Sequence, residues 1–148
     1  MLTKLLACSA AMAAFALTAC GSRVNLAASP TTLGAVQVRV VDAYAYGARV
    51  SVKAVVTNTS TKPVALDPEG LDVRVAGKLL DHRGGLTTSH KPITLAPGEK
   101  HDVAVEFRAD HDLGELARAA LVVGGVSIPA NAPAKVVGEI VLSASGGM

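Results

Sequence analysis

Four histidines are the side chains of this sequence best suited to bind a metal ion. All four lie within thirty residues, and three of them have an aspartate as a neighbour in the chain. Imidazole nitrogens and carboxylate oxygens are both ligands for zinc and copper. The carboxylates of Asp110 and Asp112 would share a face if their segment is extended, because alternate strand residues point the same way. The candidate metal ligands are His82, His90, His101, Asp110, His111 and Asp112.

The spacing of these histidines matches no known metal motif. A histidine and an aspartate that are adjacent on a strand point to opposite faces, so they would not converge on one ion. Charged and histidine side chains are also ordinarily exposed to solvent. We therefore favour solvated residues at loop ends, and keep a metal-binding module as the alternative hypothesis.

The sequence contains no recognisable catalytic arrangement. Ser89 and His90 are neighbours, but a nucleophile needs a base within hydrogen-bond reach and a third group that orients this base. No Gly-x-Ser-x-Gly turn is present. Asp67 and Glu69 are better explained as caps of a turn than as the paired acids of a glycosidase. We expect no enzyme and no catalytic residues, and a hydrolase using Ser89 or His90 is the weakest alternative.

Two tyrosines are candidates for contact with a partner. Tyr44 and Tyr46 share a face if their segment is extended. Tyrosine joins a large apolar ring to a hydroxyl group, so it is found both in cores and at interfaces. Core filling or an edge contact is the favoured interpretation, and a partner contact is the hypothesis. The candidate contact regions are residues 42–47 and the irregular residues 81–92, since loops on a rigid scaffold often carry function.

The first twenty residues have the order of a secretory signal. Lys4 is followed by an apolar run over residues 5–17, and small residues precede Cys20. The tetrapeptide that ends in this cysteine, Leu17-Thr18-Ala19-Cys20, resembles the lipobox of bacterial lipoproteins. The resemblance implies cleavage before Cys20, a thioether-linked diacylglyceryl group on its sulfur, and usually a third acyl chain on its new amino terminus.

Other interpretations of this segment are weaker. Cleavage before Cys8 would leave almost no apolar run, and a retained transmembrane helix needs roughly 20 apolar residues. Gly21 follows the lipobox cysteine, and by resemblance to lipoproteins of Gram-negative bacteria the absence of aspartate there favours the outer membrane, facing the periplasm. The membrane would thus be reached through the lipid on Cys20, and no other cofactor is expected.

Removal of residues 1–19 from the 148-residue chain leaves 129 residues, enough for one domain with a real core. Cys20 is then the only cysteine, so the domain has no disulfide and no spare thiolate. The formal charge of +2 falls to about +1 without Lys4, and basic residues form no run. A nucleic-acid partner is therefore not expected, because such proteins carry a basic stripe.

Residues 20–34 are rich in small and polar side chains and are interpreted as a lipidated cysteine with a flexible tether, whose span would be roughly 20 Å. Apolar side chains then alternate with polar ones, which predicts strands at residues 36–40, 50–56, 71–75 and 103–107. The unbroken apolar run of residues 119–123 predicts a strand buried on both faces. Shorter strands are expected at residues 64–66, 93–95 and 126–128, and a last strand at residues 136–142, with a tail at residues 143–148.

Two local features complete this interpretation. Asp112 and Glu115 have the spacing of a capping box and predict one helical turn. Gly124-Gly125 predicts a tight hairpin turn. Seven to nine short strands with little helix indicate an all-β antiparallel sandwich over residues 35–142, with a barrel as the alternative.

Two segments carry a second resemblance. Residues 55–64 resemble the strand-to-turn element of bacterial immunoglobulin-like envelope domains, and Leu95-Ala96-Pro97-Gly98-Glu99 with residues 103–107 is similar to a later landmark of the same domains. The resemblance implies an immunoglobulin-like β-sandwich, here without the cysteine pair and tryptophan of antibody domains. Together with the lipobox it leads us to expect a lipid-anchored envelope protein that acts as a non-catalytic binding or accessory module. Its partner would be another envelope protein, and a small-molecule ligand is not indicated.

Overall fold

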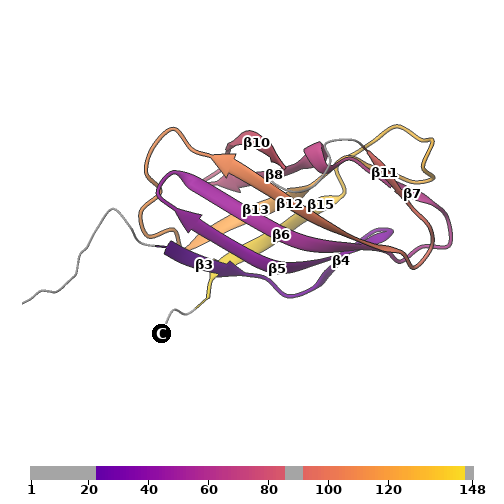
Figure 1. The fold of residues 1–148 in the computed structure, drawn as a ribbon, viewed down its shortest axis with the longest axis horizontal. Coiled ribbons are helices and arrows are strands. Elements are labelled where there is room, and N and C mark those ends of the chain that lie inside the picture. The colour runs from indigo at the N-terminus through magenta and orange to yellow at the C-terminus, as the bar shows by residue number, and fades with distance from the viewer. Residues whose placement is uncertain (1–22, 86–91, 146–148) are drawn as a thin grey trace, which may run out of the picture.

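The computed structural model describes residues 23–85 and 92–145, with residues 82–85 described by their backbone alone (Figure 1). Strands make up most of these ranges, and the all-β antiparallel class predicted from the sequence is confirmed. The one helical element in these ranges is the 3-10 turn η2 (Pro68–Gly70). No helix within them has the length and apolar character that a membrane crossing requires.

The strands belong to two antiparallel sheets. The larger sheet has the order β10-β12-β6-β5-β3-β15-β13-β8-β9, and β4 pairs with β5 beside this path. Its strands are β3 (Arg23–Ala27), β4 (Thr31–Leu33), β5 (Val36–Tyr46), β6 (Arg49–Asn58), β8 (Leu71–Val75), β9 (Lys78–Leu79), β10 (Asp81–Gly85), β12 (Lys100–Arg108), β13 (Arg118–Val123) and β15 (Gly138–Ala144). The smaller sheet consists of β7 (Val64–Leu66), β11 (Ile93–Leu95) and β14 (Val126–Ser127). The strands outnumber the seven to nine expected, because several of them have only two or three residues.

The larger sheet curls until its two edges meet. Its edge strands, β9 and β10, are separated in the chain by Leu80 alone. Figure 1 shows β5, β6 and β12 in one layer and β13 and β15 in the layer behind them. The β3–β15 pairing joins the two layers through only two residue pairs, so the curl turns there. The result is a sandwich-like arrangement with its core between the layers.

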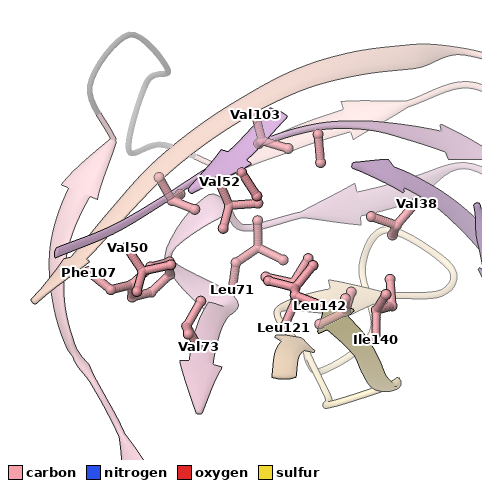
Figure 2. Close-up of a cluster of buried hydrophobic side chains, with 14 of the residues drawn as sticks. Val38, Val50, Val52, Leu71, Val73, Val103, Phe107, Leu121, Ile140 and Leu142 are labelled. Atoms are coloured by element: carbon pink, nitrogen blue, oxygen red, sulfur yellow. The ribbon is translucent and has the colours of Figure 1, made fainter. Parts of the chain in front are cut away.

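Alternating aliphatic side chains fill this core. On β6 the buried Val50, Val52, Ala54 and Val56 alternate with residues that face outward, as the sequence pattern predicted. Figure 2 shows Val50, Val52 and Phe107 of one layer facing Leu71, Val73 and Leu121 of the other. Since each fully buried aliphatic or aromatic side chain contributes about 1.5–3 kcal/mol, this packing stabilises the domain without a disulfide.

The predicted tether between residues 20 and 34 is wrong from residue 23 onward. Arg23–Ala27 forms β3, which pairs with β5 and with β15, and Thr31–Leu33 forms β4. The physical reason is Leu26, which is buried in the core and occupies the position between the two layers. Ser143 and Ala144, expected in a tail, pair with β3 and extend β15. The folded domain therefore begins at least twelve residues earlier than residue 35, within three residues of Cys20.

Two local predictions between residues 112 and 128 are also wrong. Residues 112–117 form no helical turn, because Asp112 Oδ1 accepts a hydrogen bond of 2.7 Å from the Gly114 amide and holds a local turn instead. Gly124-Gly125 does not close a hairpin, because β13 pairs with β15 and β8 while β14 pairs with β7. The two glycines carry the chain from the larger sheet to the smaller one.

A buried asparagine joins the two segments that resemble immunoglobulin-like domains. Asn58 ends β6, and its amide donates to the Glu99 carbonyl oxygen (3.0 Å) while its own carbonyl oxygen accepts from the Gly98 amide (2.8 Å). Its side chain holds the turn that follows and reaches the Leu95 carbonyl oxygen. The strand-to-turn element and the Pro97-Gly98 turn are thus one connected unit at the end of the domain far from Arg23.

Candidate functional site

The structure separates the candidate metal ligands. His101 lies near the start of β12, where it pairs with Val56, whereas the backbone of His82 pairs with Phe107 near the end of the same strand. Six residue steps along β12, from position 101 to position 107, separate these two positions, which corresponds to about 20 Å. Asp110, His111 and Asp112 follow β12, at the His82 end. His90 and Ser89 lie outside the described residues, so the structure does not place them.

At that end, Asp110 has polar contacts on both sides. His111 Nδ1 lies 2.6 Å from Asp110 Oδ1, and Lys78 Nζ on β9 lies 3.3 Å from Asp110 Oδ2. The hydrogen bond with His111, followed by that with Lys78, lowers the pKa of the Asp110 carboxyl below its ordinary value of 3.8. Any stabilisation from these contacts is therefore present at neutral pH and is lost as the pH falls through this lowered pKa.

These contacts do not assemble a metal centre. The Asp112 carboxylate accepts a hydrogen bond from the Gly114 amide, in a local turn of its own. Within residues 23–81 and 92–145, whose side chains the structure describes, no group of three or more histidine, cysteine or acidic residues could hold an ion. The alternating arrangement expected for residues 110–112 is wrong because the chain leaves β12 at Arg108 and the segment is not extended.

A surface depression of about 310 Å³ lies beside this group. It is located where the two edge strands meet, between β9 and the segment that follows β12. Its apolar lining residues are Val75, Ala76, Leu79, Leu80, Ala109 and Leu113, and its polar ones are Lys78, Asp81, Arg108, Asp110 and His111. These lining residues include no serine, threonine or cysteine, so they supply no hydroxyl or thiol nucleophile. The depression is suited to hold an apolar group with charged neighbours of both signs.

The two tyrosines lie on the outer face of β5, opposite the buried Ala43 and Ala45. They share a face, as predicted from alternation, but they do not fill the core. The Arg23 guanidinium lies over the ring of Tyr44, 4.0 Å from its centroid. Tyr46, the last residue of β5, is 40% exposed. Of the pair, Tyr46 therefore offers the larger surface to a partner.

Val41 was not among the residues predicted from the sequence, and it is 56% exposed on the same layer. A β-bulge between Val40 and Asp42 turns this side chain away from the core. It borders a second depression, of about 360 Å³, between β5, β6 and β12, which is lined partly by Arg39, Lys53 and Asp102. The available signal was the pair Val40-Val41, which interrupts the alternation of the strand.

The sheet edges offer little length for adding a partner strand. β9 has two residues, and β10 has five with a register shift between His82 and Gly85. In the smaller sheet, the edges β11 and β14 have three and two residues. Short and bulged edges are the ordinary means by which proteins prevent strand addition. A partner contact through side chains is therefore favoured over the strand addition that an exposed edge would permit.

None of the known protein-family models matches this sequence, and no curated protein matches it. Two solved structures from Bacillus subtilis are similar in fold. The yjhA protein gives a TM-score of 0.50 at 13% sequence identity over 67% of this chain and 79% of its own. The candidate lipoprotein ycdA, from subsp. subtilis str. 168, gives a TM-score of 0.59 at 12% identity over 82% of this chain and 40% of its own. This chain therefore spans less than half of ycdA, and at these identities the likeness concerns the fold.

Proposed function

We propose that this protein is anchored in a bacterial membrane by lipid on Cys20 and serves there as a non-catalytic binding or accessory module. The observation that carries the anchor is the position of β3, which begins at Arg23. The first described strand begins three residues after Cys20, so processing before Cys20 would remove none of the described strands. The similarity in fold to the candidate lipoprotein ycdA supports the same proposal.

The binding role rests on the surface chemistry of the domain. Two of its depressions, of about 310 and 360 Å³, combine apolar and charged side chains of both signs. Surfaces of this composition suit a protein partner, whose interface pairs an apolar centre with a polar rim. The outer membrane, facing the periplasm, is the proposed site, following the glycine rather than aspartate at position 21.

The experiment that tests this proposal is cross-linking in intact cells, followed by membrane separation on a density gradient and purification in mild detergent. We expect the protein in the outer-membrane fraction, together with a cross-linked species of discrete larger mass. The Cys20→Ser variant is the matched control, because it keeps every described residue and should lose both results. Wild-type protein recovered only as a free monomer would contradict the binding role.

A further inference from the structure

One end of the domain gathers the amino terminus of the fold and several chain turns. Arg23 begins β3 there, and Gly47 turns the chain between β5 and β6. The Gly47 carbonyl oxygen accepts from the Leu113 amide (2.9 Å), and the Asn25 carbonyl oxygen accepts from the Ser145 amide (2.9 Å). Figure 1 shows this end on the left, where β3 begins and β15 ends. We call it the β3 end, and the smaller sheet lies at the opposite end.

Covalent geometry limits the distance between this end and the proposed anchor. Only Gly21 and Ser22 separate Cys20 from Arg23. Three Cα-to-Cα steps reach at most about 11 Å, whatever their conformation, because an extended chain advances no more than ~3.6 Å per residue. The tether of roughly 20 Å that the sequence indicated is therefore not available. A lipid on Cys20 would hold the β3 end at the level of the headgroups.

The β3 end also exposes apolar side chains. Tyr46 ends β5 there, and Leu79 on β9, which is 49% exposed, follows the hairpin beside Asp110. Tyrosine is enriched where a bilayer meets water, because its ring is apolar and its hydroxyl is polar. The depression of about 310 Å³ lies at this end too, with Leu79 in its lining.

Charges at this end do not oppose such a contact. Arg49 Nη1 lies 3.2 Å from Glu106 Oε2, and Lys78 pairs with Asp110. Other exposed charges at this end are also of both signs, Arg108 and Arg118 against Asp81, Asp112 and Glu115. The surface is therefore neither strongly acidic nor polybasic, and the membrane contact would depend on the anchor and the apolar side chains rather than on anionic lipid.

We propose that the β3 end is the membrane-contact surface of this protein, with Tyr46 and Leu79 at the lipid headgroups and the smaller sheet directed away from the bilayer. This inference rests on the proposed lipid anchor at Cys20. It also assigns Tyr46 to lipid rather than to a protein partner. The second depression, which borders Val41 in the middle of the β5–β6–β12 layer, remains accessible from the side.

A single tryptophan can report this orientation, because the chain has none of its own. The Tyr46→Trp variant places the probe at the β3 end. The Val136→Trp variant is the matched control, because Val136 is 68% exposed and its neighbour Val137 donates to the Val123 carbonyl oxygen at the far end of β13. β13 runs from Arg118 at the β3 end to Val123, and its five residue steps span about 17 Å. In the proposed orientation, position 136 therefore lies about this distance further from the membrane than the β3 end does.

Each lipidated full-length variant is purified from membranes and reconstituted into phosphatidylethanolamine–phosphatidylglycerol vesicles, with or without bromine on the acyl chains near the headgroups. We expect bromine to quench the fluorescence of the Tyr46→Trp variant several-fold more than that of the Val136→Trp variant. Equal quenching, no quenching, or stronger quenching at position 136 in protein of confirmed lipidated mass would overturn the orientation and leave the anchor intact. A mass without lipid on Cys20 would overturn the anchor itself, and this inference with it.

Discussion

Replacing Asn58 by alanine is expected to lower the free energy of unfolding by about 4 kcal/mol, since each of its four side-chain hydrogen bonds has a net value of about 1 kcal/mol. The side chain has no exposed surface. Its Nδ2 donates to the carbonyl oxygens of Lys62 (2.8 Å) and Leu95 (3.0 Å), and its Oδ1 accepts from the amide (2.9 Å) and hydroxyl (2.7 Å) of Ser60. Alanine would leave the Leu95 carbonyl oxygen buried without this donor.

Urea unfolding followed by circular dichroism measures this loss. The matched control is Asn131→Ala, because Asn131 is exposed, and exposed substitutions ordinarily change stability by no more than about 0.5 kcal/mol. Domains of this size have a total stability of about 5–15 kcal/mol, so the Asn58 variant should unfold at a much lower urea concentration. A loss equal to that of the control would show that the Asn58 junction does not hold the two segments together.

The Gly70→Ala variant is expected to lose about 3 kcal/mol, at the upper end of the cost of overpacking. A β-carbon on Gly70 would lie 2.5 Å from the Gly125 Cα and 2.6 Å from the Gly124 carbonyl carbon. These are backbone atoms, and they cannot rotate away as a side chain could. The same backbones are joined, because the Gly70 carbonyl oxygen accepts from the Gly124 amide (3.0 Å). The added carbon would separate η2 from the crossing between the sheets.

Gly34→Ala is the control for this prediction. Gly34 has a φ of +61° but nothing within 4 Å of an added β-carbon, so its substitution tests backbone conformation without a collision. The expected loss is about 1–2 kcal/mol, the usual cost of the left-handed region for a non-glycine residue. Thermal unfolding compares the two variants, and a Gly70 variant more stable than the Gly34 variant would contradict the close backbone approach.

The strands that the sequence predicted best are those in which alternation is strict. Apolar and polar residues alternate from Arg49 to Ala54, and β6 buries the predicted Val50, Val52, Ala54 and Val56. β3 was missed because it has only two partly or fully buried apolar side chains, Val24 and Leu26, among small and polar residues. Its place in the sheet depends on pairing with strands that are 17 or more residues away in the sequence, and no local pattern encodes that pairing.

The positions of the candidate site residues were likewise predictable only where they depend on local strand geometry. Alternation correctly placed Tyr44 and Tyr46 on one face, because that depends only on local backbone geometry. The contact between Lys78 and Asp110 was not predictable, since it requires the β8–β9 hairpin to meet the end of β12. The histidines were grouped by their nearness in the sequence, yet β12 carries the chain across the domain between His101 and His111.

The lipid on Cys20 can be tested by the intact mass of protein extracted from the membranes of the producing bacterium. We predict a chain that starts at Cys20 and carries the added mass of a diacylglyceryl group with an amide-linked acyl chain. The Cys8→Ser variant should give the same product, because cleavage before Cys20 would remove residue 8. A chain that retains Met1, or one that starts at Cys20 with a free thiol, would contradict the account.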